Sequence, residues 1–191
     1  MKEEIIKTVE VLRKGGIILY PTDTVWGIGC DATDPEAVAR VFEIKKRADS
    51  KSLVLIAGDM DMVCRYVKEI PEMAVQLVEV NDKPMTIVYP GALTGKGVLA
   101  PAVVAEDGTV GIRIPMMDFC RQLASRFGRP IVSTSANISG APTPKRFAEI
   151  PQEIKDAVDY IVEPSFERGS TGQASSIIKV GLDFSVEIIR K

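Results

Sequence analysis

The sequence contains no histidine among its 191 residues. This absence excludes serine–histidine triads, cysteine–histidine pairs, histidine zinc sites and histidine proton shuttles. Any chemistry must therefore depend on carboxylates, lysine, arginine, hydroxyl groups, backbone amides, or a metal ion that arrives with a substrate.

Cysteine is also scarce, since the chain has only Cys30, Cys64 and Cys120. The three are widely spaced and form no Cys-x-x-Cys pair. An odd number at such spacing argues against a disulfide framework and is typical of a reducing compartment. We therefore expect a cytoplasmic protein in which each thiol is a small core residue.

Long apolar runs are missing as well. No run approaches the roughly 18 residues that a membrane-spanning helix needs, and the N-terminal segment MKEEIIKTVE is charged and helical in period, unlike a secretory leader. We therefore expect no membrane association.

The formal net charge is −2, so no positive field over the whole protein attracts nucleic acid. A local basic patch on the surface is still compatible with this charge.

What the sequence does have is an alternation of short apolar runs and helical patterns along its whole length. The apolar fraction of 46% is sufficient for a large core. The clearest predicted helices are 2–14, 34–46 and 118–126, and the clearest predicted strands are 17–20, 53–57, 85–89 and 109–115. Because several adjacent strands have no helix between them, we expect a single α/β domain over 1–191 with a mixed, open sheet.

The stretch Arg129–Pro144, RPIVSTSANISGAPTP, changes abruptly from a predicted strand to small polar side chains. These are Ser133, Thr134, Ser135, Asn137 and Ser139. Ligands of open α/β sheets bind beyond strand ends, where hydroxyl and amide groups are ready hydrogen-bond partners. From spacing alone, the stretch is either a pocket rim or an ordinary serine- and glycine-rich turn.

A second strand end of this kind lies near the N-terminus. The segment PTDTVWGIGCDA, residues 21–32, puts Thr22, Asp23 and Thr24 directly after a predicted strand. Its glycines allow close approach of the backbone to a ligand. The alternative is a hairpin with a tryptophan packed over it.

A basic cluster surrounds the turn between the predicted helix 34–46 and the predicted strand 53–57. It consists of Lys45, Lys46, Arg47 and Lys51. The helix dipole favours cations at a helix C-terminus, and this alone is one interpretation. Because four cations exceed what capping requires, the other interpretation is a clamp for an anion.

An arginine interrupts the predicted strand Thr109–Pro115, TVGIRIP, which has apolar residues on one face and Thr109, Gly111 and Arg113 on the other. Arginine is uncommon within a strand unless it has an anionic partner. This face is therefore either solvent-exposed or directed at an anionic ligand.

Taken together, YPTDTVWGIG, EIKKR with Lys51 and Leu53 behind it, TVGIRIP and STSANISGAPTP resemble the YrdC-domain family, in its branch of threonylcarbamoyl-AMP synthases. The resemblance extends from Gly15 to Arg190, with the motifs in the family's order. The catalytic Lys, Arg, Ser, Asn quartet of the family falls on Lys45, Arg47, Ser135 and Asn137.

The resemblance implies a twisted α/β domain in which L-threonine, bicarbonate and ATP give threonylcarbamoyl-AMP and pyrophosphate. Mg²⁺ would arrive on the triphosphate, and no protein-bound metal is expected. The product feeds the N6-threonylcarbamoyladenosine modification at position 37 of tRNA through separate threonylcarbamoyl-transferase proteins. Some members of the family bind double-stranded RNA.

The resemblance also implies a set of ligand contacts. The ATP contacts would be Arg47, Lys51, Thr109, Ser135, Asn137, Thr143 and Arg190. The threonine contacts would be Thr22, Arg113, Ser133 and Ser176. The chain departs from the family at Ala48 and Ser52, where proline is frequent, and this affects the expected loop conformation more than the chemistry.

Two other functions stay open at this point. One is an RNA-binding or ribosome-associated factor of the same fold without turnover, based on the basic cluster and recognisable by strongly salt-dependent RNA affinity. The other is an adenylate-forming enzyme for a different amino acid, since Thr22 and Ser176 would select only for a side-chain hydroxyl.

Overall fold

The computed structural model describes residues 1–46 and 53–191, whose strands form two sheets. The four-stranded sheet has the order β7 (Thr134–Ser135), β2 (Gly27–Gly29), β1 (Ile18–Tyr20), β8 (Tyr160–Ile161). The six-stranded sheet has the order β10 (Val186–Arg190), β9 (Ser176–Val180), β4 (Met85–Tyr89), β5 (Val110–Arg113), β3 (Leu55–Ile56), β6 (Ile131–Val132).

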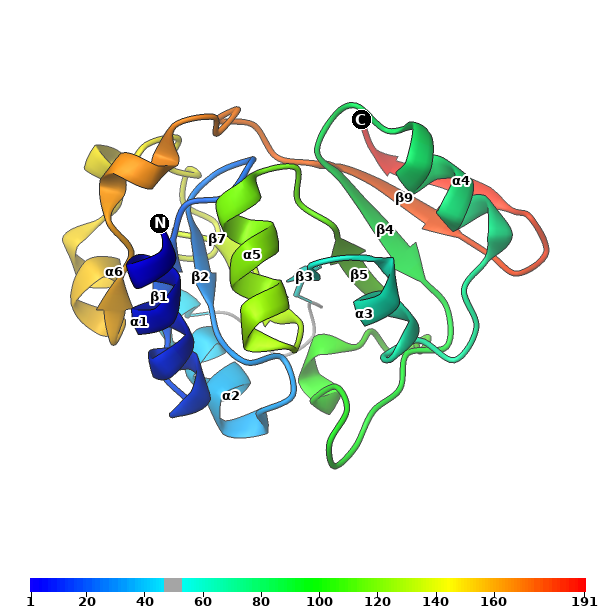
Figure 1. The fold of residues 1–191 in the computed structure, drawn as a ribbon, viewed down its shortest axis with the longest axis horizontal. Coiled ribbons are helices and arrows are strands. Elements are labelled where there is room, and N and C mark those ends of the chain that lie inside the picture. The colour runs from blue at the N-terminus through cyan, green and yellow to red at the C-terminus, as the bar shows by residue number, and fades with distance from the viewer. Residues whose placement is uncertain (47–52) are drawn as a thin grey trace.

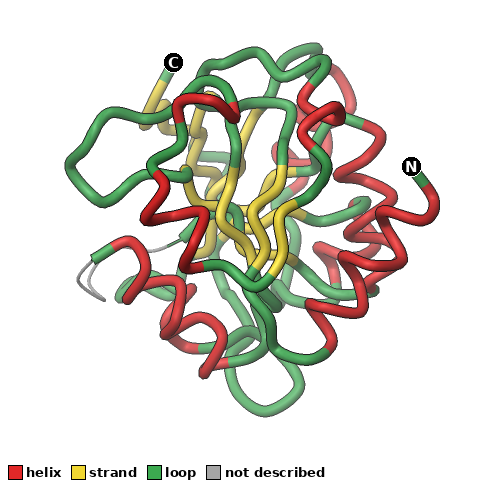
Figure 2. Tube along the Cα trace, turned by 90° about the vertical axis from the view of Figure 1, so that its left-hand side faces the viewer, coloured by secondary structure: helices red, strands yellow, loops and turns green. Residues whose placement is uncertain are grey.

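Helices cover these sheets on both sides, as Figure 2 shows. The α-helices are α1 (Lys2–Arg13), α2 (Pro35–Lys45), α3 (Met60–Cys64), α4 (Glu72–Val80), α5 (Asp118–Phe127) and α6 (Gln152–Ala157). Short 3₁₀ helices lie at Pro101–Val103, Phe147–Glu149 and Pro164–Glu167. In the part of the chain that the structure covers, no helix is both long and apolar enough to cross a membrane.

Both sheets are mixed, which confirms the predicted α/β class. The pairs β4–β9, β3–β5 and β1–β8 are parallel, whereas β1–β2, β2–β7, β4–β5, β3–β6 and β9–β10 are antiparallel. The strands are divided between two sheets, however, where one was expected. Several of them are only two or three residues long, and the pairing of such short strands depends on contacts distant in sequence rather than on local pattern.

Strand β1 lies between two apolar clusters. Its residues Ile18 and Tyr20 pack with α1 and α5, whereas Leu19 packs in the larger cluster that includes α2. Figure 1 shows α1 and α5 side by side in front of the four-stranded sheet. Because β1 is buried on both faces, the loop that follows it is held by the core at its start.

The cysteines follow the prediction at two of three positions. Cys30 and Cys120 are buried, and burial raises the pKa of both thiols above the ordinary value. Cys64 is exposed, so the expectation of a core residue is wrong there. The reason is that α3 is a short helix that buries Met62 and Val63 and ends at Cys64.

Candidate active site

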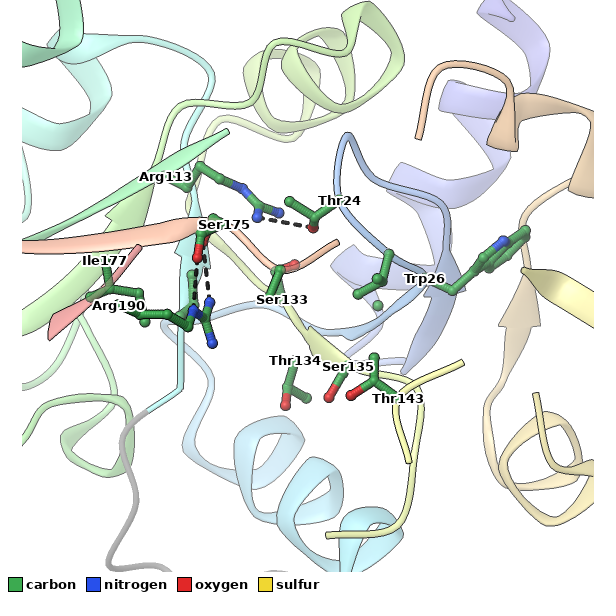
Figure 3. Close-up of a pocket in the computed structure, with 14 residues that line it drawn as sticks. Thr24, Trp26, Arg113, Ser133, Thr134, Ser135, Thr143, Ser175, Ile177 and Arg190 are labelled. Atoms are coloured by element: carbon green, nitrogen blue, oxygen red, sulfur yellow. Dashed lines mark hydrogen bonds between the residues drawn. The ribbon is translucent and has the colours of Figure 1, made fainter. Parts of the chain in front are cut away.

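A cavity of about 300 Å³ is lined by residues from both sheets (Figure 3). The lining residues are Thr24, Val25, Trp26, Gly27, Val54, Arg113, Ser133, Thr134, Ser135, Thr143, Ala174, Ser175, Ile177 and Arg190. Two of these described residues are arginines and none is acidic. The cavity is therefore suited to an anionic ligand.

Arg113 is the last residue of β5, and its side chain is only 4% exposed. Its Nη1 donates to Thr24 Oγ1 at 3.0 Å, its Nη2 donates to Thr22 Oγ1 at 3.5 Å, and Nη2 lies 3.4 Å from Asp23 Oδ1. The interpretation of this strand face as solvent-exposed is therefore wrong. Strands β3 and β4 pair with β5 on either side, which fixes the arginine at the cavity wall.

One guanidinium nitrogen of Arg113 has no hydrogen bond. This nitrogen, Nε, is buried and has no hydrogen-bond partner among the residues that the structure describes. An unpartnered buried donor costs about 1–3 kcal/mol. A carboxylate or phosphate ligand in the cavity would supply the missing acceptor.

Arg190 reaches the same cavity from β10 (Figure 3). Its Nε donates to the carbonyl oxygen of Ser175 at 2.8 Å, and its Nη2 donates to Ser175 Oγ at 3.5 Å. Partial desolvation and the nearby charge of Arg113 lower the pKa of the Arg190 guanidinium from its ordinary value. Two cations that disfavour each other across one cavity again favour an anionic ligand.

Ser133 lies where the chain passes from the six-stranded sheet to the four-stranded one, between β6 and β7. Its backbone N–H donates to Val54 O at 2.8 Å, and Ser135 is paired with Gly27 of β2. This crossing places Ser133, Thr134 and Ser135 along the cavity. The stretch is therefore more than an ordinary turn, and its geometry agrees with the pocket-rim interpretation.

Lys45 supports this rim from behind. The side chain is 3% exposed, and its Nζ donates to Ser135 O at 2.6 Å, to Asn137 O at 2.9 Å and to Asn137 Oδ1 at 3.2 Å. Ser135 Oγ also donates to Asn137 Oδ1. Three members of the predicted quartet thus lie in one hydrogen-bonded group. Ser135 lines the cavity, and Lys45 and Asn137 hold Ser135 in place through these hydrogen bonds. The fourth, Arg47, lies outside the described residues.

The remaining predicted contacts are distributed unevenly. Thr143 lines the cavity, whereas Thr22 lies behind Arg113 and is 1% exposed. Thr109 lies before β5, at the opposite end from Arg113, and its hydroxyl donates to Asp107 Oδ1 at 2.6 Å rather than lining the cavity. Lys51 lies outside the described residues.

Ser176 is not brought to the cavity, whereas its neighbour Ser175 is. Side chains of a strand alternate between the two faces of a sheet. Ser175 and Ile177 therefore share the cavity face, and Ser176, which pairs with Met85, lies on the other face. Sequence reasoning missed Ser175 because two adjacent serines carry no signal for which of them faces a ligand.

The segment after β1 combines both interpretations offered for it. Strands β1 and β2 form the alternative hairpin, with Trp26 fully buried and its Nε1 donating to Glu167 Oε2 at 2.7 Å. The same segment also contributes Thr24, Trp26 and Gly27 to the cavity lining.

Comparison with known proteins agrees with the resemblance seen in the sequence. A family model for Sua5, YciO and YrdC proteins, described as Telomere recombination, matches residues 10–191. The chain belongs to this family.

The individual relatives share one name. The chain is similar to the threonylcarbamoyl-AMP synthase of Chromohalobacter salexigens, with 34% identity over 160 residues that cover 83% of this chain and 84% of that protein. It is similar to the protein of the same name from Photobacterium profundum, with 28% identity over 193 residues and 99% coverage of both.

Solved structures of the same fold include P. abyssi Sua5 complexed with L-threonine, with a TM-score of 0.82 and 29% identity over 92% of this chain. This chain spans 50% of that Sua5 chain. E. coli YciO has a TM-score of 0.80 and 25% identity, and the match covers 100% of this chain and 90% of that one.

Proposed function

We propose that this chain is an L-threonylcarbamoyladenylate synthase, which forms threonylcarbamoyl-AMP and pyrophosphate from L-threonine, bicarbonate and ATP. The observation that carries the proposal is the buried guanidinium of Arg113, which faces a hydroxyl-lined cavity with one donor unpartnered. The relatives named threonylcarbamoyl-AMP synthase support it, as does the L-threonine bound by Sua5.

The threonine side of the cavity is centred on Arg113. A guanidinium binds a carboxylate through two parallel hydrogen bonds, and the Nε of Arg113, which has no partner among the described residues, is a donor that such a pair would satisfy. Ser133 provides a hydroxyl beside it, and Thr22 holds the arginine from behind. We propose Ser175 for the role first assigned to Ser176, because Ser175 is the serine at the cavity.

The nucleotide side consists of Ser135, Thr143 and Arg190 at the cavity. Lys45 and Asn137 would act by fixing the backbone around Ser135. We retain Arg47 and Lys51 as the ligands of the ATP phosphates, and Thr109 as a nucleotide contact, on the family resemblance alone.

The chemistry needs orientation and charge neutralisation rather than a histidine. The threonine amine and bicarbonate form a carbamate with loss of water, which depends on holding the reactants together. The carbamate oxygen then attacks the α-phosphorus of ATP, and the bond to the departing pyrophosphate breaks. Positively charged side chains and the Mg²⁺ that ATP carries would stabilise the negative charge. Because no described lining residue is acidic, the triphosphate itself would hold that Mg²⁺.

The RNA-binding alternative receives less support. Of its basic cluster, Lys45 is buried against the Ser135 loop and Lys46 pairs with Glu153 at 2.6 Å, while the other two members lie outside the described residues.

We propose that residues 1–191 act as one cytoplasmic catalytic domain. Its product would pass to threonylcarbamoyl-transferase proteins, which would transfer the threonylcarbamoyl group to tRNA.

The test is an assay for pyrophosphate release by the purified protein with ATP, bicarbonate, Mg²⁺ and L-threonine. We expect release that depends on threonine and is much weaker with serine. A folded protein that releases no pyrophosphate in response to threonine contradicts the proposal. Equal release with serine contradicts the choice of amino acid.

A further inference from the structure

We infer that Asp23 is a positioning residue: its carboxylate fixes the guanidinium of Arg113 in the orientation that it has at the cavity wall. This inference rests on the proposed function, because the ligand is taken to be the threonine carboxylate. Asp23 does not line the cavity with Arg113 and would act only through the arginine.

The carboxylate of Asp23 is itself anchored. The residue is 3% exposed, and its Oδ2 accepts a hydrogen bond from the backbone N–H of Met116 at 3.0 Å. Its Oδ1 lies 3.4 Å from Nη2 of Arg113 and has no hydrogen-bond partner among the described residues. One oxygen thus holds Asp23 in place, and the other is left to act on the arginine.

The loop that carries Asp23 is also fixed by its backbone. The carbonyl oxygen of Asp23 accepts from Thr171 N at 3.0 Å, and that of Thr24 accepts from Gly172 N at 2.8 Å. The chain continues from Gly172 to Ser175 at the cavity. A rigid loop can impose a direction on the guanidinium, whereas a mobile one could not.

The direction follows from the contacts. Thr24 engages Nη1, and Thr22 and Asp23 engage Nη2, so this one loop engages both terminal nitrogens. Nε is the nitrogen that the loop does not contact. A neutral side chain in place of Asp23 would keep the hydroxyl contacts but lose the one charged contact that Arg113 makes among the described residues.

Charge neutralisation alone makes the opposite prediction. If Asp23 merely reduced the positive charge at the cavity, its removal would strengthen the attraction between Arg113 and a carboxylate. If Asp23 positions the guanidinium, its removal weakens threonine binding. The sign of the change therefore separates the two roles.

The chain offers a matched control in Asp118. Asp23 and Asp118 both line a second cavity of about 660 Å³, which also includes Met116 and Phe119. Asp118 Oδ2 accepts from Gln122 Nε2 at 2.7 Å, and Asp118 is not among the residues that contact Arg113. Asp118→Asn thus removes the same charge from the same cavity without touching the arginine.

The experiment measures L-threonine affinity by calorimetry for the wild type, Asp23→Asn and Asp118→Asn, together with the KM values for threonine and ATP. We expect Asp23→Asn to weaken threonine binding and to raise the threonine KM about tenfold, with the ATP KM unchanged, and Asp118→Asn to change none of them. Unchanged or tighter threonine binding by folded Asp23→Asn overturns the inference, as does an equal effect of Asp118→Asn.

A second measurement needs no activity. In ¹⁵N spectra of the wild type and Asp23→Asn, we expect separate Nη1 and Nη2 signals for Arg113 in the wild type and faster exchange between them in the variant, because Asp23 slows rotation about the Nε–Cζ bond beyond what Thr22 and Thr24 do. Averaged Nη signals in the wild type, or the same exchange rate in folded Asp23→Asn, overturn the inference. If the wild type shows no threonine-dependent pyrophosphate release, the proposed function fails, and this comparison still tests the role of Asp23.

Discussion

The two arginines of the cavity are held in opposite ways. Arg113 stands on β5, a strand with neighbours on both sides, and is buried among contacts to three consecutive residues, Thr22–Thr24. Arg190 stands on the edge strand β10, is exposed, and bonds Ser175. Arg113 is thus part of a preformed wall of the cavity, whereas Arg190 is part of an adaptable rim.

The strand pairing explains the difference. Moving Arg113 would disturb the pairing of β5 with both β3 and β4. Strand β10 pairs with β9, and the register of that pair shifts between Ile188 and Arg190. Such irregularities at sheet edges bend the strand and redirect a side chain. We therefore expect the Arg113 side to determine which amino acid binds and the Arg190 side to adjust to the nucleotide.

The largest expected effect is that of Arg113→Lys. A lysine ammonium cannot contact Thr22 and Thr24 and also grip a carboxylate with two parallel bonds. We expect kcat/KM for threonine to fall about 100-fold, which corresponds to about 3 kcal/mol, with the KM for ATP little changed. Steady-state pyrophosphate release measures both, with the exposed Arg126→Lys as the control. A wild-type kcat/KM in Arg113→Lys would contradict the interpretation of Arg113 as a preformed binding group for the threonine carboxylate.

Ser135→Ala tests the rim on the nucleotide side. Ser135 lines the cavity and donates to Asn137 Oδ1, so its loss removes one ligand contact and loosens the group around Lys45. We expect the KM for ATP to rise about tenfold, as for the loss of one hydrogen bond of about 1.4 kcal/mol, while threonine affinity and the fold persist. The control is Ser139→Ala, whose side chain is exposed. A larger change for threonine than for ATP would reverse the assignment of the two sides.

The sequence was sufficient to predict what depends on local pattern. It predicted strand β4 at its observed bounds, the polar residues at the ends of β1 and β6, and an arginine whose strand position required a partner. It also gave the hydroxyl stretch that lines the cavity. Each of these follows from alternation, residue type and turn residues within a few positions of one another.

What the sequence did not predict depends on contacts between distant segments. The division into two sheets, the burial of Lys45 beneath Ser135, and the choice of Ser175 over Ser176 are all of this kind. A lysine at a helix C-terminus is usually solvated, and only the loop folded over it provides the carbonyl oxygens that make its burial favourable.

Arg190→Gln should have a smaller effect than either change above. Its hydrogen bonds to Ser175 are only part-buried and lie at an edge strand, where water replaces them at less cost than in the core. We expect the KM for ATP to rise about fivefold, or about 1 kcal/mol, and the increase to shrink at high salt because exposed charges are screened. Pyrophosphate assays at two ionic strengths measure this. A loss as large as that of Arg113→Lys would remove the distinction between the two arginines.

The smallest expected effects come from the adjacent serines, and here the difference between the two variants matters more than either value. Ser175 Oγ lies 2.8 Å from Thr86 Oγ1 and accepts from Arg190, so Ser175→Ala affects both the wall and the rim. Ser176 lies on the other face of β9, paired with Met85. We expect Ser175→Ala to lower kcat/KM for threonine about threefold, within the range of one hydrogen bond, and Ser176→Ala to leave it unchanged. The opposite order would mean that β9 has the other face toward the ligand. Because alternation fixes both serines together, that result would also displace Ile177 and the contact that holds Arg190.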